Sequence, residues 1–162
     1  LYEELQSNGL AASTAILAYG DHGEAFNEHQ NNIIHSKAVF DENVHVPMLL
    51  IHPGRFGLPA RISQLGSVQD ILPTTFDLLG LPLEPRDGMS LFFDAPERLV
   101  FALTDYGPGQ IGLRDKRFTY ILFRNGKELF FDRDADPAEL TNVLDRFPED
   151  VARFRARLQP KK

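Results

Sequence analysis

The chain has 162 residues, 43% of them hydrophobic, a formal net charge of −6 and no cysteine. That length is enough for one sizeable domain or one and a half, and the lack of cysteine excludes disulfides, cysteine-based metal sites and thiol catalysis. The acidic charge, with no basic run before the last few residues, argues against nucleic acid as a partner.

The first element expected in chain order is a short helix. Leu1 and Leu5 lie on one helical face, and Asn8-Gly9 forms a stop signal. Because this helix begins at the first residue without a cap, we expect the chain to be a C-terminal fragment of a longer protein or a separately expressed region.

The next element is an apolar run, 15–19, that ends abruptly at Gly20-Asp21-His22-Gly23-Glu24. An apolar strand followed by glycines and charged residues is typical of chemistry placed at a sheet edge. The carboxylate of Asp21 and the imidazole of His22 suit zinc, manganese or iron better than calcium, which prefers oxygen ligands. Two ligands are not a complete site, and such a pair alone is more often a hydrogen-bonding or capping feature.

A set of motifs follows this loop in a fixed order: Glu28-His29, His35-Ser36-Lys37, Phe40-Asp41-Glu42-Asn43, and Val46-Pro47 before the strand Met48-Leu49-Leu50-Ile51. This series resembles the C-terminal half of the sulfatases of the alkaline phosphatase superfamily. Those proteins carry a strand and a D-(H/N)-G-E loop, a Glu-His pair, a His- or Lys-bearing turn, a (Y/F)-(D/E)-E segment and a V-P that begins the next strand.

The resemblance implies roles for several of these residues. Asp21 and His22 would be ligands of one divalent metal ion (Mn, Zn, Fe or Ca). His35 falls where the family places a cationic catalytic group beside the sulfate or phosphate of an anionic ester substrate. Lys37 is the weaker catalytic candidate, because it is one step away from the usual lysine. The remaining histidines are expected to be structural or surface residues: His29, His45 and His52.

Residues 69–80 show the apolar spacing of a helix buried on one side, with Pro73 in its early turn and a glycine stop. The family has a similar signature here, followed by a D-G-x-S-L motif that residues 87–91 match. Within this segment, Asp70 and Asp77 are expected to cap and pack.

The sequence changes character after Pro96. Short β-type runs follow, with the hairpin signal Asn125-Gly126 between the last two, and then a helix over 149–158. The runs cover 99–103, 111–114, 118–123 and 128–131. None of their residues is a catalytic candidate, so we interpret this part as structural.

The predicted fold class is α/β. Residues 1–95 are expected to form part of an alkaline phosphatase-like, mostly parallel sheet flanked by helices, with strand 15–19 beside strand 47–52. Residues 96–162 are expected to form a small antiparallel subdomain with the last helix packed across its sheet.

The function implied is that of a metal-dependent sulfatase-like hydrolase acting on sulfate esters. The family's nucleophile motif, (C/S)-x-P-x-R, has no match, since the nearest pattern, 57–61, has glycine at the nucleophile's place. We therefore expect this chain alone to be inactive and to need the N-terminal half of the same protein. The family places such enzymes in the periplasm, outside the cell or at a membrane.

Two other functions stay open. The Asp-His form of the loop is compatible with a phosphodiesterase, a phosphonate hydrolase or a membrane phosphoglycerol or phosphoethanolamine transferase. A non-catalytic binding module that keeps the fold without the nucleophile is the third possibility.

Overall fold

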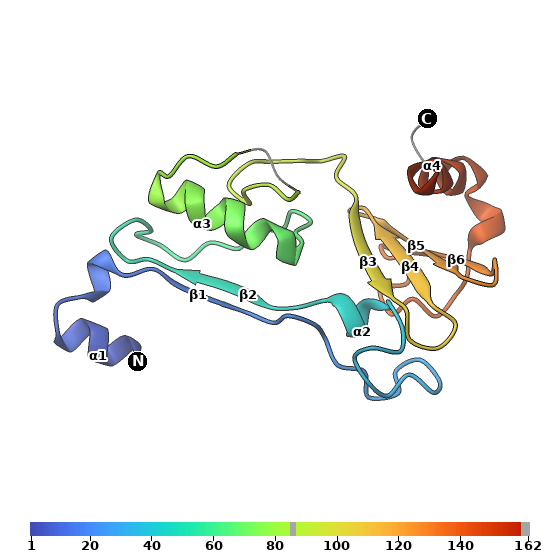
Figure 1. The fold of residues 1–162 in the computed structure, drawn as a ribbon, viewed down its shortest axis with the longest axis horizontal. Helices are drawn as coiled ribbons and strands as arrows, with labels where there is room; N and C mark the ends of the chain where they lie inside the picture. Colours follow the sequence, from blue (N-terminus) through green and yellow to red (C-terminus); the bar gives the residue numbers. More distant parts are fainter. Residues whose placement is uncertain (85–86, 160–162) are drawn as a thin grey trace.

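A computed structural model describes residues 1–84 and 87–159 of the chain (Figure 1). Its helices and strands are α1 (Tyr2–Ser7), β1 (Ile16–Tyr19), α2 (Asp41–Val44), β2 (Met48–Ile51), α3 (Ile71–Leu79), β3 (Val100–Thr104), β4 (Gln110–Arg114), β5 (Phe118–Phe123), β6 (Glu128–Asp132) and α4 (Pro148–Leu158), with 3-10 turns at Ala11–Ser13, Val68–Asp70 and Leu144–Arg146. None of the helices in this described part is long and apolar enough to cross a membrane.

Strands β1 and β2 pair with each other, as the sequence predicts, but they run antiparallel, with Tyr19 opposite Met48. The expectation of a mostly parallel sheet is therefore wrong for these two strands. The physical reason lies in the connection, 20–47, whose only α-helix is the single turn α2. A parallel pair needs a crossover that returns the chain to the far end of the sheet, whereas this loop re-enters at the edge it left.

Helix α3 lies along the β1–β2 pair (Figure 1) and ends at Gly80, which has φ +65°. A left-handed residue at this position ends a helix, and glycine adopts that conformation without steric cost. The buried carboxylate of Asp70 accepts hydrogen bonds from the backbone amide of Ser67 and from the guanidinium of Arg98, while Asp77 accepts one from the hydroxyl of Ser90. Asp70 thus has the predicted capping role, whereas Asp77, inside α3, packs against Ser90 through its hydrogen bond.

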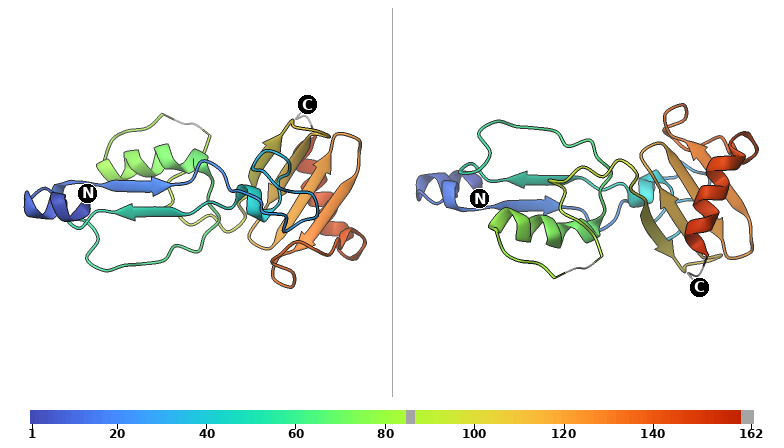
Figure 2. Two further views of the ribbon diagram at one scale, coloured as in Figure 1. Left: turned by 90° about the horizontal axis from the view of Figure 1, so that it is seen from below. Right: turned by 90° about the horizontal axis from the view of Figure 1, so that it is seen from above.

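The C-terminal sheet is an antiparallel meander in the order β3-β4-β5-β6. The predicted hairpin turn joins β5 to β6, with Gly126 at φ +85°. Successive residues of a strand point to opposite faces, so Tyr120 packs with α4 while Ile121 packs on the other side. Figure 2 shows α4 across one face of this sheet and α2 with its flanking loops across the other.

The core on the α4 side is rich in aromatic residues, and the helix contributes Val151 and Phe154, both almost completely buried. On the opposite face, Val39 and Phe40 pack against Ile121 and Phe131. Residues from the first half of the chain thus share a core with the C-terminal sheet. The predicted boundary near residue 95 stays a prediction.

Candidate active site

The D-H-G-E loop leaves β1 beside the start of β2 and then passes close to α2. The amide of Gly20 donates to the carbonyl of Pro47 (3.2 Å), and the amide of Gly23 donates to the carbonyl of Asn43 (2.8 Å). A side chain at Gly23 would collide with the carbonyl oxygen of Glu42. Glycine at this position therefore allows the backbone of the loop to lie directly on α2.

Asp21 and His22 lie in the exposed part of this loop. Nδ1 of His22 is 2.9 Å from the carbonyl oxygen of Gly23, and Nε2 is 3.7 Å from Oδ2 of Asp21. A carbonyl oxygen only accepts hydrogen bonds, so Nδ1 carries a hydrogen and Nε2 of the neutral ring keeps its lone pair. This is the form in which an imidazole binds a metal ion.

His35 meets His22 although the two come from different parts of the long loop. Their rings stack with centroids 4.1 Å apart and planes inclined by 23°. Nδ1 of His35 lies 3.3 Å from Oε2 of Glu24. One ligand atom from each of His22, Glu24 and His35 lies within 4.8 Å of the others, and we call these three residues the histidine cluster.

Lys37, the second predicted catalytic residue, makes its hydrogen bond outside this cluster. Its ammonium donates to the backbone carbonyl of Asn31 (2.8 Å). In the described part of the chain it makes no ion pair with a residue of the histidine cluster. Of the two predicted catalytic residues, His35 therefore contacts the predicted metal loop and Lys37 does not.

The other three histidines differ in their surroundings. His29 is mostly buried and hydrogen-bonds through both ring nitrogens, whereas the exposed His45 pairs with Asp41 (3.0 Å). His52 has a buried Nδ1 without a hydrogen-bond partner. These positions are compatible with the structural or surface roles expected for them.

Two residues of the site carried no prediction from the sequence. Glu24 hydrogen-bonds His35, and Asn43 holds both the loop at Gly23 and the backbone of His35. Glu24 could have been proposed from the sequence, because it is the last residue of the D-H-G-E motif. Asn43 ends the segment Phe40-Asp41-Glu42-Asn43 in the sequence, but no local pattern gave it a role, because its contacts depend on how the loop returns to α2.

The donor atoms fit a divalent metal ion. Two ligands about 2.1 Å from one ion at a tetrahedral angle lie about 3.4 Å apart, and Nε2 of His22 and Oδ2 of Asp21 are separated by 3.7 Å. Asp21 is 86% exposed, so its carboxylate can adjust to an ion without losing a buried contact. A nitrogen donor beside an oxygen donor matches ions of intermediate softness.

Comparison with known proteins shows which family the chain resembles. The family model described as "Sulfatase" matches residues 1–81. Arylsulfatase K of Gallus gallus is 31% identical over 91% of this chain and 31% of its own length. Arylsulfatase K of Homo sapiens is 30% identical over 86% of this chain and 29% of its own length. The chain thus spans about 30% of the length of these relatives.

Solved structures show the same fold. A 2-O GAG sulfatase superposes with a TM-score of 0.82 over 97% of this chain and 38% of its own, at 22% identity. The phosphonate monoester hydrolase of Agrobacterium radiobacter superposes with a TM-score of 0.78 over 97% of this chain and 36% of its own, at 25% identity. The alkaline phosphatase-like fold is therefore confirmed. Because the family model matches half of the chain, we conclude that the chain belongs to the sulfatase family.

Proposed function

We propose that this chain supplies the metal-binding loop and an anion-contacting imidazole to the active site of a sulfate ester hydrolase. The observation that carries the proposal is the contact between His22 and His35, whose rings stack at 4.1 Å. Asp21 stands beside His22. A pair of metal-ligating groups therefore adjoins a second imidazole that can donate a hydrogen bond to an anionic ester.

Sulfatases are in general metal-dependent. In this chain Asp21 and His22 would hold one divalent ion (Mn, Zn, Fe or Ca), with further ligands from outside the chain. The mixed nitrogen and oxygen pair favours Mn, Zn or Fe over Ca, which prefers oxygen ligands. When bound, such an ion supplies positive charge that stabilises the negative charge on the reacting ester.

The proposed role of His35 is to orient the sulfate group. Its Nδ1 lies 3.3 Å from Oε2 of Glu24, so Nε2 is the ring nitrogen left for a sulfate oxygen, and it donates to that oxygen when the ring is in the imidazolium form, with hydrogens on both nitrogens. Lys37 is the secondary candidate for the same task. Its ammonium would first have to leave the carbonyl of Asn31, and we therefore assign it a smaller share of the binding.

The reaction needs a nucleophile whose oxygen forms a bond to sulfur while the bond from sulfur to the ester oxygen breaks and the alcohol leaves. No serine or threonine of this chain is followed by proline two residues later and arginine four residues later. We therefore propose that the nucleophile comes from the N-terminal half of the same protein. In this arrangement the present residues bind and orient the substrate, and they leave the covalent step to that half.

Hydrolysis of phosphonate monoesters is a second candidate. It is supported by the likeness to the phosphonate monoester hydrolase of Agrobacterium radiobacter, at 25% identity. Sulfate esters and phosphonate monoesters both present a tetrahedral anionic centre, so the same loop and imidazole would serve either substrate. The two candidates differ in which ester the complete protein turns over faster.

The decisive experiment measures kcat/KM of the full-length protein for 4-nitrophenyl sulfate and for an aryl phosphonate monoester. We expect the sulfate to be preferred. The variants His22→Ala and His35→Ala should each lower kcat/KM by about 10²-fold or more. His45→Ala is the matched control, because His45 is exposed and outside the histidine cluster.

A preference for the phosphonate would establish the second candidate instead. Lack of turnover with both esters, by a folded and metal-supplemented protein, would favour a binding module. Full activity of His22→Ala or His35→Ala would overturn the site assignment itself.

A further inference from the structure

Glu139, in the loop after β6, is a buried acidic residue with an unusual backbone. It is 1% exposed and has φ +56°, a conformation that residues other than glycine seldom adopt. Its carboxylate accepts hydrogen bonds from Arg114 (2.8 Å), Thr119 (2.5 Å) and the backbone amide of Asp41 (2.9 Å). The first two partners lie in the C-terminal sheet, whereas Asp41 begins α2.

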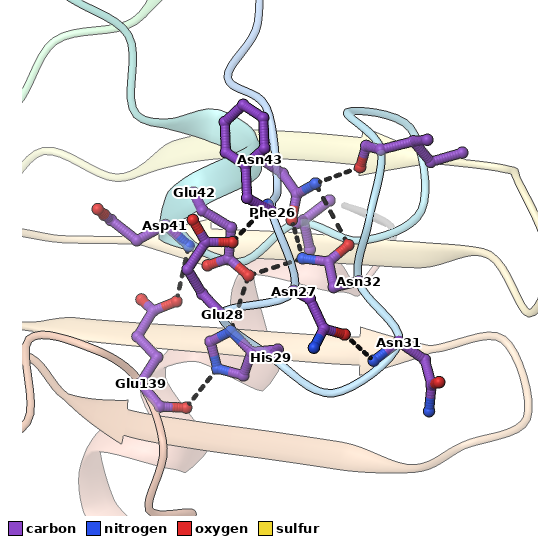
Figure 3. Close-up of polar contacts among 12 residues, drawn as sticks. Phe26, Asn27, Glu28, His29, Asn31, Asn32, Asp41, Glu42, Asn43 and Glu139 are labelled. Carbon is purple, nitrogen blue, oxygen red and sulfur yellow. Dashed lines mark hydrogen bonds and ion pairs between the residues drawn. The ribbon is translucent and has the colours of Figure 1, made fainter.

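The backbone of Glu139 also takes part in a contact: its carbonyl oxygen accepts a hydrogen bond from Nε2 of His29 at 2.9 Å. The other ring nitrogen, Nδ1, lies 2.8 Å from Oε1 of Glu42 on α2. The imidazole also stacks on Phe40, with centroids 3.7 Å apart. Figure 3 shows His29 between Glu42 and Glu139.

Both hydrogen-bond partners of His29 are acceptors, since one is a carboxylate and the other a carbonyl. The ring satisfies both only when it donates from both nitrogens, which is the imidazolium form. The charged groups that act on the ring are Glu42 on α2 and Glu139 after β6. Glu139 in turn pairs with Arg114 on β4, and the charge of Arg133, after β6, also interacts with Glu139. Burial lowers the pKa of His29, but the bonds to Glu139 and Glu42 outweigh burial and raise it.

Helix α2 also makes hydrogen bonds to the loop that precedes it, through Glu42 and Asn43. Asn32 donates to Oε1 of Glu42 (2.7 Å) and to Oδ1 of Asn43 (2.6 Å). The side-chain amide of Asn43 donates to the carbonyls of Ile34 (2.9 Å) and His35 (3.3 Å). Figure 3 shows these amides side by side.

Asn43 reaches the other half of the site through its backbone. Its carbonyl accepts the amide hydrogen of Gly23, the residue after His22. The two stacked imidazoles of the site, those of His22 and His35, are thus both attached through adjacent residues or backbone atoms to one asparagine of α2.

We infer that His29, Glu42, Asn43 and Glu139, which we call the polar joint, are positioning residues for the active site. The inference rests on the proposed function, because it concerns how the histidine cluster is held for catalysis. Glu139 fixes α2 relative to the C-terminal sheet, and His29 ties α2 to the loop between the metal loop and His35. The C-terminal sheet therefore acts on the site through position, without touching the substrate.

Two variants of His29 separate its two contacts. Glutamine places its amide nitrogen at about the reach of Nε2 and can donate to Glu139, whereas asparagine matches Nδ1 and can donate to Glu42. The matched control is His45→Gln, which changes an exposed histidine at the end of α2 that contacts neither acceptor. Urea unfolding of each variant establishes that it is folded.

The first measurement is made on the 162-residue chain and does not depend on turnover. We expect His29→Asn, which loses the bond to Glu139, to move the amide resonance of Gly23 and the ring resonances of His35 in two-dimensional NMR spectra. His29→Gln, which loses the bond to Glu42 on α2, should move them as well, whereas His45→Gln should leave them unchanged. Unchanged resonances at Gly23 and His35 in both His29 variants would overturn the inference.

The second measurement is made on the full-length protein with 4-nitrophenyl sulfate. A misplaced catalytic group lowers kcat, so we expect His29→Asn to reduce kcat by about 10- to 100-fold with little change in KM. Equal kcat for His29→Asn and the unmodified protein would contradict the inference. If the unmodified protein lacks turnover, the proposed function fails, while the NMR result still decides whether the joint positions the loop.

A third measurement needs no substitution, so it holds even if both His29 variants unfold. The nitrogen resonances of the His29 ring should show hydrogens on both nitrogens at about pH 6. A ring with a single hydrogen at about pH 6 would mean that one of the two contacts is missing and would overturn the inference.

Discussion

The imidazole rings of His22 and His35 stack face to face, with their centroids 4.1 Å apart. They come from different parts of the long loop that leaves β1, and Asn43 of α2 holds both Gly23 and the carbonyl of His35. The site is therefore organised by α2, a helix of a single turn, and not by the strand that precedes the metal loop.

If Asp21 and His22 are metal ligands, the full-length protein and the 162-residue chain should differ in their affinity for Mn²⁺. In the full-length protein, His22→Ala and Asp21→Ala should each weaken Mn²⁺ binding by about tenfold or more, because loss of one ligand opens the site. The 162-residue chain should bind Mn²⁺ weakly, since two ligands do not enclose an ion. Isothermal titration of each protein checks this, with His45→Ala as the control. Equal affinity of the full-length protein with and without His22 would remove that residue from the site.

The chain alone should hydrolyse neither aryl sulfates nor phosphodiesters above background. Orientation of a substrate without a nucleophile lacks the covalent step. The measurement is release of 4-nitrophenol by the purified 162-residue chain after gel filtration. Turnover that co-elutes with the chain and disappears in Asp21→Ala would show that the chain contains a nucleophile of its own.

The sequence predicted elements whose signals are local. The glycine stop of α3 at Gly80, the hairpin at Gly126 and the D-H-G-E loop after β1 each depend on a few neighbouring residues, and all three are present. The contact of His22 with His35 was not predicted, because spacing along the chain does not show how a long loop folds back. The resemblance to the sulfatases gave each residue a role but not their stacking.

Other features depend on contacts between distant parts of the chain, which no local pattern reports. His29 looked like a surface or structural residue because its acceptor, the carbonyl of Glu139, lies far along the sequence. The antiparallel pairing of β1 with β2 was missed for a related reason. Strand direction follows from the path of the connection, and apolar runs at 15–19 and 48–51 are the same for either direction.

The buried ion pair between Arg114 and Glu139 predicts a large loss of stability when one partner is removed. Arg114→Ala should lower the free energy of unfolding by about 3–5 kcal/mol, because it leaves the carboxylate of Glu139 buried without its cation. Arg153→Ala, which removes an exposed arginine paired with Asp115, should cost only about 0–1 kcal/mol. Urea unfolding followed by circular dichroism compares the two. Similar losses would mean that the Arg114 pair is open to solvent.

His29 predicts a pH-dependent share of stability. Its pKa is raised above the ordinary 6.5, since the bonds to Glu139 and Glu42 outweigh the opposing effect of burial. A raised pKa means that the contribution is fully present below about pH 6.5 and is lost as the pH rises through the folded-state pKa. The stability difference between the unmodified chain and His29→Gln should therefore be larger at about pH 5.5 than at about pH 8.5. A difference that grows with pH would show that His29 is neutral when the chain is folded.

Gly23 offers the sharpest test of how the metal loop is held, because a methyl group there would collide with the carbonyl oxygen of Glu42. Gly23→Ala should destabilise the 162-residue chain by about 1–3 kcal/mol. Gly57→Ala is the matched control, since a Cβ at Gly57 meets nothing within 4 Å. Urea unfolding measures both.

The same pair of variants separates stability from position. If the loop must rest on α2 to present Asp21 and His22, then Gly23→Ala should also weaken Mn²⁺ binding by the full-length protein by about tenfold, whereas Gly57→Ala should leave it unchanged. A Gly23→Ala protein that loses stability but keeps its affinity for Mn²⁺ would mean that the loop forms its site independently of α2. In that case the helix would serve the fold alone, and the attachment of Gly23 to Asn43 would have no bearing on the metal.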